Sequence, residues 1–236
     1  MKLINKSGRN NNGHKVIKSK GKLYNKRVYK KIDFKRDLSV FKVNNILYDS
    51  NRTSYIASDN KNNYILAPKG IEKGDILFAK NSNVKNLKIG DNNYLKNIKL
   101  GTVIHNVSLY PKSKGQLARS AGTHAILLNH IGDKTIINLN KRVIFKLSNM
   151  CNASLGFVSN INHNQKKLKK AGNSRWIGRH PIVRGIAKNP TDHPHGGGGG
   201  KSKGGRYPVN SLGKLTKGFK TVKKKKCRDL LGKLSI

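Results

Sequence analysis

The chain has 236 residues, of which 50 are basic and 10 are acidic, so its formal net charge is +40 at pH 7. This charge excludes an ordinary cytosolic enzyme as the first interpretation, because self-repulsion opposes a compact state unless a polyanion neutralises it. Only 35% of the residues are hydrophobic. A core can therefore form in part of the chain, and the rest is expected to be arm or tail that orders on its partner, for which nucleic acid has the complementary charge.

Residues 1–31 predict a basic arm rich in glycine and asparagine. From Ile32 onward, short apolar runs alternate with turn residues, a pattern typical of β-strands. The runs lie at residues 46–48, 64–67, 75–78 and 102–107. Many short strands with little helical periodicity favour small barrels over an α/β sheet. The β-rich stretches are interpreted as two barrels that meet near residues 105–111.

The clearest β signal is a meander of three strands over residues 124–128, 135–139 and 143–147, with turns at 131–134 and 140–141. A short helix or turn is predicted near residues 165–170. After about Ala171, glycine, proline, arginine and lysine dominate to the end of the chain. Such a segment cannot bury enough apolar surface to fold alone, so it is predicted to be an extended tail.

Two motifs near residue 195 could carry enzyme chemistry, and both lack what that chemistry needs. The run from Gly196 to Ser202 ends like a phosphate-binding P-loop, but His195 stands where the first glycine is required. Asp192 beside His193 could orient a general base, or His193 and His195 could bind a metal. No cysteine pair accompanies them, and acidic residues are scarce. We predict no catalytic and no metal residues here, only hydrogen bonds to nucleotides and to the loop itself.

Basic residues interleaved with aromatic and glycine residues are more informative. Arg175, Trp176, Arg179 and Arg184 lie in one glycine-containing stretch. Guanidinium and indole planes can stack on bases splayed out of irregular or single-stranded RNA. Small residues surround Arg119 in the run 115–122, which suggests a tight loop against a nucleic-acid backbone.

These motifs together resemble one family, the second protein of the large ribosomal subunit in its bacterial and organellar form. The resemblance is carried, in family order, by residues 7–13, 32–36, 48–52, 65–70, 115–122 and 183–198. The most specific stretch is the last, which contains Asp-His-Pro-His-Gly-Gly-Gly. One departure is Asn152 after Cys151, where the family usually has an RNA-contacting arginine.

The resemblance implies an all-β chain with an OB-fold barrel over residues 32–106 and an SH3-like barrel over 107–171. These follow the N-terminal arm of residues 1–31 and precede an rRNA-binding tail over 172–236. It implies a structural component of the large subunit that binds large-subunit rRNA near the peptidyl-transferase centre and supports subunit association. Partners would be other large-subunit proteins and the small subunit at the interface, with no membrane and no cofactor beyond structural Mg²⁺ held through rRNA. The expected rRNA-binding residues are Arg9, Arg52, Arg119, Arg175, Trp176, Arg179, Arg184, His193, His195 and Lys201.

In the family that the chain resembles, the histidine at the position of His193 has been discussed as affecting peptide-bond formation. We assign His193 a role in RNA architecture, since RNA can carry that chemistry without a protein base. The abundance of lysine, asparagine and isoleucine suggests an AT-rich genome, and we expect a mitochondrial ribosome, with a plastid-type organelle as the alternative. Two other functions compete: a free-standing nucleoid protein that coats DNA, and, more weakly, an RNA-processing enzyme that uses Asp192 and His193.

Overall fold

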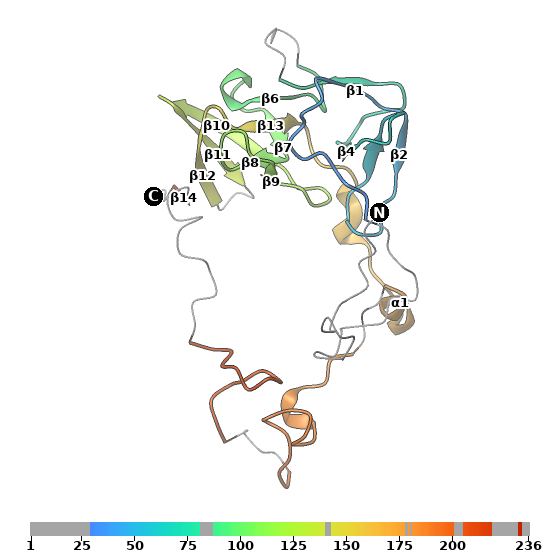
Figure 1. The fold of residues 1–236 in the computed structure, drawn as a ribbon, viewed down its shortest axis with the longest axis vertical. Helices are drawn as coiled ribbons and strands as arrows, with labels where there is room; N and C mark the ends of the chain where they lie inside the picture. Colours follow the sequence, from blue (N-terminus) through green and yellow to red (C-terminus); the bar gives the residue numbers. More distant parts are fainter. Residues whose placement is uncertain are drawn as a thin grey trace. The chain divides into compact units, whose positions relative to one another are not determined.

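A computed structural model describes residues 29–80, 87–139, 143–177, 179, 181–200, 205–218 and 231–232 (Figure 1). The described residues fall into two compact units. The first unit comprises residues 29–167 together with residues 231–232, and the second comprises described residues from 168 to 218. Most of the predicted arm, residues 1–28, lies outside the described residues, as do the predicted RNA contacts Arg9 and Lys201.

The first unit begins with a β region over residues 29–80, built from short antiparallel strands. In β1 and β5, Phe41 and Leu77 face each other and are buried, while the residues on either side of each are exposed. This alternation is the two-residue period of a strand with one face on a core. The sheets here are the meander β2-β3-β4 and the pair β1-β5, with bounds β1 (Val40–Lys42), β2 (Asn45–Leu47), β3 (Ile56–Ser58), β4 (Tyr64–Leu66) and β5 (Ile76–Phe78).

The second β region comprises residues 87–167 together with residues 231–232. It contains a seven-stranded sheet of order β14-β12-β11-β10-β7-β13-β6 and a separate β8-β9 hairpin. Its apolar core includes Ile104, Leu127, Ile137 and Leu147, all fully buried. The elements are β6 (Asn92–Tyr94), η1 (Leu95–Asn97), β7 (Val103–His105), β8 (Val107–Ser108), β9 (Gly115–Leu117), β10 (Ala125–Ile131), β11 (Lys134–Leu139), β12 (Val143–Ser148), β13 (Asn152–Leu155), η2 (Ile161–Gln165) and β14 (Leu231–Gly232).

The predicted meander is confirmed as β10, β11 and β12, which pair antiparallel in sequence order. The all-β prediction is confirmed as well: two β regions follow each other, as expected of an OB-fold barrel and an SH3-like barrel. The four predicted domain ranges stay predictions. In the structure β6 and β7, which precede the predicted boundary at residue 107, are strands of the seven-stranded sheet.

Hydrogen bonds join the two β regions into one unit. The Lys69 N–H donates to the Phe157 carbonyl at 2.8 Å, and the Ser159 N–H donates to the Ala67 carbonyl at 3.0 Å. The Phe34 carbonyl accepts from the Gly115 N–H at 3.0 Å and from the side-chain amide of Asn106 at 3.1 Å. The segment around Phe34 is therefore fixed against the β8-β9 hairpin.

Two buried basic side chains lie within this unit. Burial lowers the pKa of Arg36 to about 10, although Asp33 and Asp91 oppose the shift. Burial likewise lowers the pKa of His105 to about 4, and its Nδ1–H donates to the Gly156 carbonyl at 2.9 Å. Both side chains are packed inside the protein, so neither is available to a nucleic acid in this conformation.

The described residues of the second unit contain one α-helix, α1 (Ala171–Trp176), a 3-10 turn η3 (Gly185–Ala187) and a bridge between Val209 and Leu215. The predicted helix near residues 165–170 is wrong in position, because η2 ends at Gln165 and α1 begins at Ala171. Lysines at 166, 167, 169 and 170 explain the difference. Like charges three and four residues apart destabilise a helix.

Candidate nucleic-acid interface

Several carboxylates of the first unit accept hydrogen bonds from backbone N–H groups of the same unit. Asp33 accepts hydrogen bonds from the backbone N–H groups of residues 35, 36 and 37 at 2.9, 2.8 and 2.9 Å. Asp91 accepts from the N–H groups of Phe78 at 2.8 Å and Lys88 at 2.9 Å. These scarce negative charges hold turns together instead of neutralising surface lysines. The excess of positive charge therefore remains available to attract a polyanion.

Two of the predicted RNA-binding arginines meet at one aromatic ring. The Arg119 guanidinium lies 4.6 Å from the centroid of the Phe34 ring, and that of Arg52 lies 5.6 Å from the same centroid. Arg52 also lies 6.0 Å from the centroid of Tyr29. These distances are within the range of cation–π attraction. The ring of Phe34 thus connects the loop before β3 with the loop after β9.

The two arginines differ in what else they contact. Arg52 Nε donates to Asp49 Oδ2 at 2.8 Å, and the side chains are 17% and 2% exposed. Arg119 is exposed, and its Nη1 donates to the Gly115 carbonyl at 3.5 Å. The charge of Arg52 is therefore largely neutralised within the protein, whereas the charge of Arg119 is available to a phosphate or a base. Sequence reasoning treated the two as equivalent, and the structure separates them.

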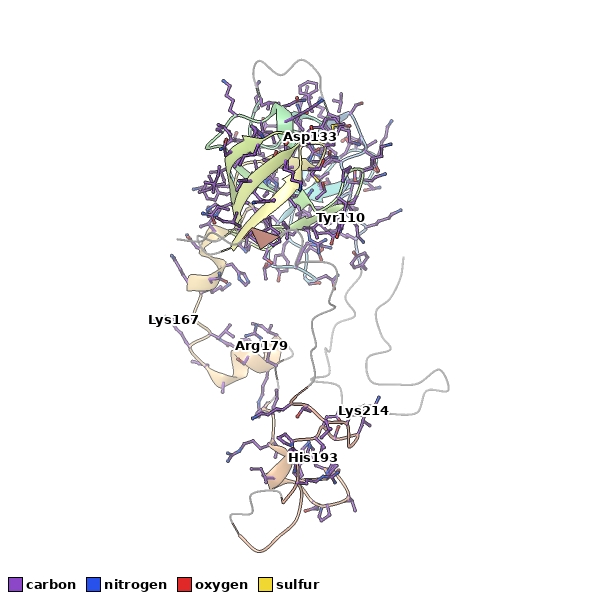
Figure 2. The ribbon with its side chains drawn as sticks, turned by 90° about the vertical axis from the view of Figure 1, so that its left-hand side faces the viewer. Tyr110, Asp133, Lys167, Arg179, His193 and Lys214 are labelled. Atoms are coloured by element: carbon purple, nitrogen blue, oxygen red, sulfur yellow. The ribbon has the colours of Figure 1, made fainter. Side chains whose placement is uncertain are left out.

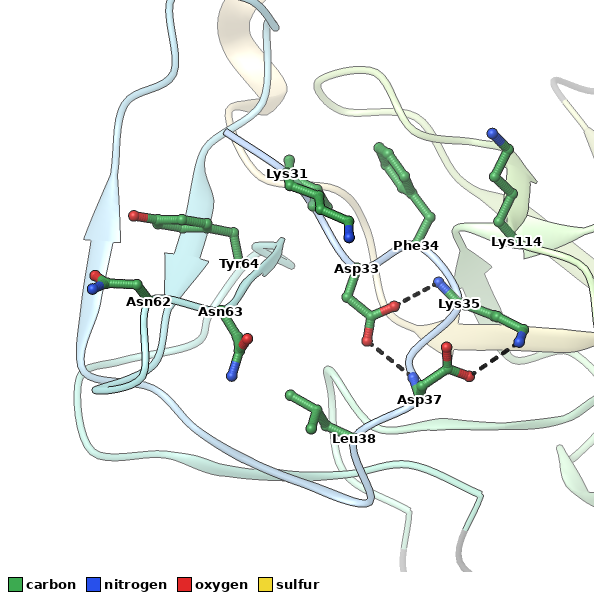
Figure 3. Close-up of a pocket in the computed structure, with 11 residues that line it drawn as sticks. Lys31, Asp33, Phe34, Lys35, Asp37, Leu38, Asn62, Asn63, Tyr64 and Lys114 are labelled. Atoms are coloured by element: carbon green, nitrogen blue, oxygen red, sulfur yellow. Dashed lines mark hydrogen bonds and ion pairs between the residues drawn. The ribbon is translucent and has the colours of Figure 1, made fainter. Parts of the chain in front are cut away.

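A cavity of about 430 Å³ lies beside this cluster. Figure 3 shows that the segment carrying Lys31 and Phe34 runs between β4, with Tyr64, and the region of Lys114. Asp37, which also lines the cavity, pairs with Lys35 at 3.6 Å and with Lys80 at 3.2 Å. Lys31 and Lys114 are exposed lysines of the lining. They extend the cationic surface next to Arg119 and were not among the predicted contacts.

The second unit exposes apolar and cationic side chains together. Trp176, the last residue of α1, is 83% exposed, and Tyr207 is 82% exposed. Arg175, Arg179 and Arg184 are exposed as well. Monomeric surfaces seldom leave large aromatic side chains uncovered unless a partner covers them. Exposed indole, phenol and guanidinium planes are the groups that stack on bases.

The segment that begins with η3 is a loop closed by hydrogen bonds of its own backbone. The Asn189 carbonyl accepts from the N–H groups of Asp192 at 3.0 Å and His193 at 3.2 Å, and the Gly196 N–H donates to the His193 carbonyl at 2.8 Å. The Gly197 N–H donates to the Lys188 carbonyl at 3.1 Å. This loop, residues 185–197, presents His193 at a fixed position in the second unit (Figure 2).

Both predicted histidines of this loop accept hydrogen bonds from backbone N–H groups. His193 Nδ1 accepts from the His195 N–H at 3.0 Å, and His195 Nε2 accepts from the Val209 N–H at 3.0 Å. The two rings stack with centroids 5.3 Å apart. Desolvation, and then the electrostatic influence of His195 and Lys188, lower the pKa of His193. A ring nitrogen that accepts an N–H is unprotonated, so His193 is neutral with its proton on Nε2.

Other chemistry finds no assembled site in the described part of the chain. No group of three or more histidine, cysteine, aspartate or glutamate side chains comes close enough to hold a metal ion there. Cys151 is buried as a free thiol, and burial raises its pKa. No helix in the described ranges is both long and apolar enough to cross a membrane.

The structure brings Arg52 and Arg119 together in the first unit, and His193 and His195 together in the second. Sequence reasoning missed the ring of Phe34, which Arg52 and Arg119 both contact. The Asp33-Phe34 pair stands in a recognised motif, but nothing in its spacing reveals two arginines that are 18 and 85 residues further along the chain. It also missed Gly185, whose place beneath the His193 ring depends on the fold of the loop.

Comparison with known proteins agrees with this geometry. The family model described as Ribosomal Proteins L2, RNA binding N-terminal domain, matches residues 1–79, and the one described as Ribosomal Proteins L2, C-terminal domain, matches residues 88–213. The large ribosomal subunit protein uL2 of Ehrlichia chaffeensis is 43% identical over 229 residues, covering 94% of this chain and 82% of the relative. That of Orientia tsutsugamushi is 45% identical over 224 residues, covering 92% and 81%. The chain therefore belongs to the ribosomal protein L2 family.

Proposed function

We propose that the chain is a structural component of the large ribosomal subunit that binds large-subunit rRNA near the peptidyl-transferase centre. The observation that carries the proposal is that a chain which matches the L2 family over most of its length exposes arginine and aromatic side chains in both units. Other large-subunit proteins and the small subunit are its further partners, and it supports association of the two subunits. Mg²⁺ enters only with the rRNA.

Binding rests on two kinds of contact. The net charge of +40 supplies sequence-independent affinity, because each lysine or arginine that reaches a phosphate releases condensed counterions. Shape is read by particular groups: Arg119 against Phe34, the exposed Arg175 and Trp176 at the end of α1, and the loop that presents His193. RNA with unpaired or splayed bases suits such planes better than a regular duplex does.

We propose that the protein has no enzymatic activity of its own. Three of the ten acidic side chains are engaged inside the first unit: Asp33 and Asp91 accept backbone N–H groups, and Asp49 pairs with Arg52. His193 Nδ1 already accepts a backbone N–H, which removes that nitrogen as a general base in this conformation. Catalysis near this protein would then belong to the RNA.

We further propose a mitochondrial ribosome as its location, with a plastid-type organelle as the alternative. The support is compositional: lysine, asparagine and isoleucine, which AT-rich codons encode, are abundant along the chain. The named relatives are bacterial, so a bacterial ribosome is the outcome that would overturn the location. Immunogold labelling or fractionation of the source cells distinguishes the three.

The proposed function is tested by crosslinking. The purified large subunit is irradiated, the protein is isolated under denaturing conditions, and the attached RNA is sequenced. Crosslinks are expected in large-subunit rRNA close to the peptidyl-transferase centre. A protein that crosslinks mainly to genomic or organellar DNA and does not sediment with the large subunit would be a nucleoid protein, and the proposal would be refuted.

A further inference from the structure

The imidazole of His193 is held from several directions. Its Nδ1 accepts the His195 N–H at 3.0 Å, and one side of the ring faces the imidazole of His195 at 5.3 Å between centroids. Gly185 lies against the ring so closely that a Cβ at this position would be 2.5 Å from Cε1 and 2.7 Å from Nε2. Any residue other than glycine at position 185 would therefore have to displace the ring or the backbone of η3.

These contacts leave one nitrogen for an outside partner. The side chain of His193 is partly exposed. Its Nε2 is therefore not a buried polar atom left without a hydrogen-bond partner. No hydrogen bond reaches Nε2 from another residue in the described ranges. With Nδ1 engaged as an acceptor, the neutral ring carries its proton on Nε2. The group presented to the surroundings is a single N–H donor in a fixed direction.

We propose that His193 binds RNA as a hydrogen-bond donor through Nε2–H, and that Gly185 is the positioning residue that allows the ring to take this orientation. The partner is an acceptor atom of RNA, either a phosphate oxygen or a carbonyl or ring nitrogen of a base. This inference rests on the proposed function, since it assigns one contact within the proposed rRNA interface. It also gives His193 a chemical role that general-base catalysis would contradict, because a base would need an unprotonated nitrogen facing outward.

The same geometry separates the roles of the two histidines. His195 receives the Val209 N–H on its Nε2, so that nitrogen is used inside the protein. The backbone of His195, not its side chain, sets the tautomer of His193. His195 therefore holds the loop to the segment around Val209, and His193 is the member of the pair that contacts RNA.

Two replacements of nearly equal size distinguish which nitrogen is used. The side-chain amide of glutamine can place an N–H near the position of imidazole Nε2, whereas that of asparagine reaches only the position of Nδ1. Affinity of the full-length chain for a transcript of the large-subunit rRNA is measured for His193→Gln and His193→Asn. We expect His193→Gln to stay within about twofold of the unchanged chain and His193→Asn to bind roughly three- to tenfold more weakly, as for one lost hydrogen bond.

The positioning role is tested by Gly185→Ala, with Gly172→Ala as the matched control. Both add one methyl group to the second unit, but a Cβ at Gly172 meets no atom within 4 Å outside its helix. Gly185→Ala is expected to weaken rRNA binding by the same factor as His193→Asn. Gly172→Ala controls for the added methyl group, and the His193 resonance should not change in that variant. Imidazole nitrogen NMR of the free chain should find the His193 proton on Nε2, and Gly185→Ala should alter that resonance.

Each outcome decides between the alternatives. Retained binding by His193→Asn with loss in His193→Gln, or an NMR signal that places the proton on Nδ1, would overturn the donor assignment. Unchanged affinity and an unchanged resonance in Gly185→Ala would overturn the role of Gly185. A wild-type chain that binds the rRNA transcript no better than duplex DNA would refute the proposed function itself, a result separate from any difference among the variants.

Discussion

Replacing Arg52 with alanine is expected to destabilise the free protein by about 3 kcal/mol. The Arg52–Asp49 pair is short, 2.8 Å, and the Asp49 side chain is 2% exposed. Loss of one partner of a fully buried pair costs about 3–5 kcal/mol. In the variant, Asp49 still accepts a hydrogen bond from the Asn51 N–H at 2.9 Å, and the Arg52 side chain is 17% exposed. We therefore expect loss of the ion pair to cost about 2 kcal/mol of stability. The contacts with Phe34 and Tyr29 add about 1 kcal/mol.

The assay is thermal unfolding of the full chain, monitored by circular dichroism. For a protein of this length each kcal/mol moves Tm by about 2–4 °C, so Arg52→Ala should lower Tm by roughly 6–12 °C. Arg119→Ala is the matched control, because it removes the same charge and a contact with the same Phe34 ring. Since Arg119 is exposed and lacks a carboxylate partner among the described residues, its loss should cost about 1 kcal/mol.

Affinity for rRNA should show the reverse order. Arg119→Ala is expected to weaken binding and to reduce the slope of affinity against salt by about one, as for one lost phosphate contact. Arg52→Ala should change that slope little once the variant is folded. Equal Tm losses in the two variants, or a larger salt effect for Arg52→Ala, would refute the division of roles between the two arginines.

Three further outcomes are expected. Replacing Arg175 and Trp176 with alanine should lower the yield of assembled large subunits more than replacing two lysines of 223–226, since stacking planes are harder to substitute than one phosphate contact; equal yields would count against this ranking. Burial lowers the pKa of His105 from 6.5 to about 4, so the unfolded chain binds the proton before the folded chain does as the pH falls. The free energy of unfolding, measured with urea, should therefore decrease by up to about 3 kcal/mol between pH 6.5 and pH 4. It should not change with this group above pH 6.5. His105→Asn should flatten that profile. Gly115→Ala should unfold the β8-β9 hairpin region, because a Cβ there would overlap the facing backbone, and a soluble variant with an unchanged Tm would contradict this.

Local pattern was enough to predict the β architecture. The meander of β10, β11 and β12 was predictable because its apolar runs and turn residues are adjacent in the sequence, as with Gly132 in the turn between Ile131 and Lys134. Strand order was not predictable in this way. β14 pairs with β12 although more than 80 residues separate them in the chain, and no local property of either strand encodes that partner.

The candidate site shows the same limit. Charge and aromatic content predicted Arg119 and Trp176 as RNA contacts, because exposed cations and planes suit RNA wherever they fold. The Asp-His-Pro-His motif and the family resemblance predicted His193. The sequence could not reveal that Arg52 is paired with Asp49. Nor could it reveal that a glycine eight residues away supports the His193 ring. Both relations arise from the three-dimensional fold of loops, where spacing carries little information.

The central claim, that this chain is an rRNA-bound component of the large ribosomal subunit, is tested most directly by gradient sedimentation of a cell or organelle lysate in high salt, with sequencing of the RNA crosslinked to the protein. The account predicts that the protein stays with the large subunit and that its crosslinks fall in large-subunit rRNA near the peptidyl-transferase centre. Release by salt into a free pool associated mainly with DNA would contradict it.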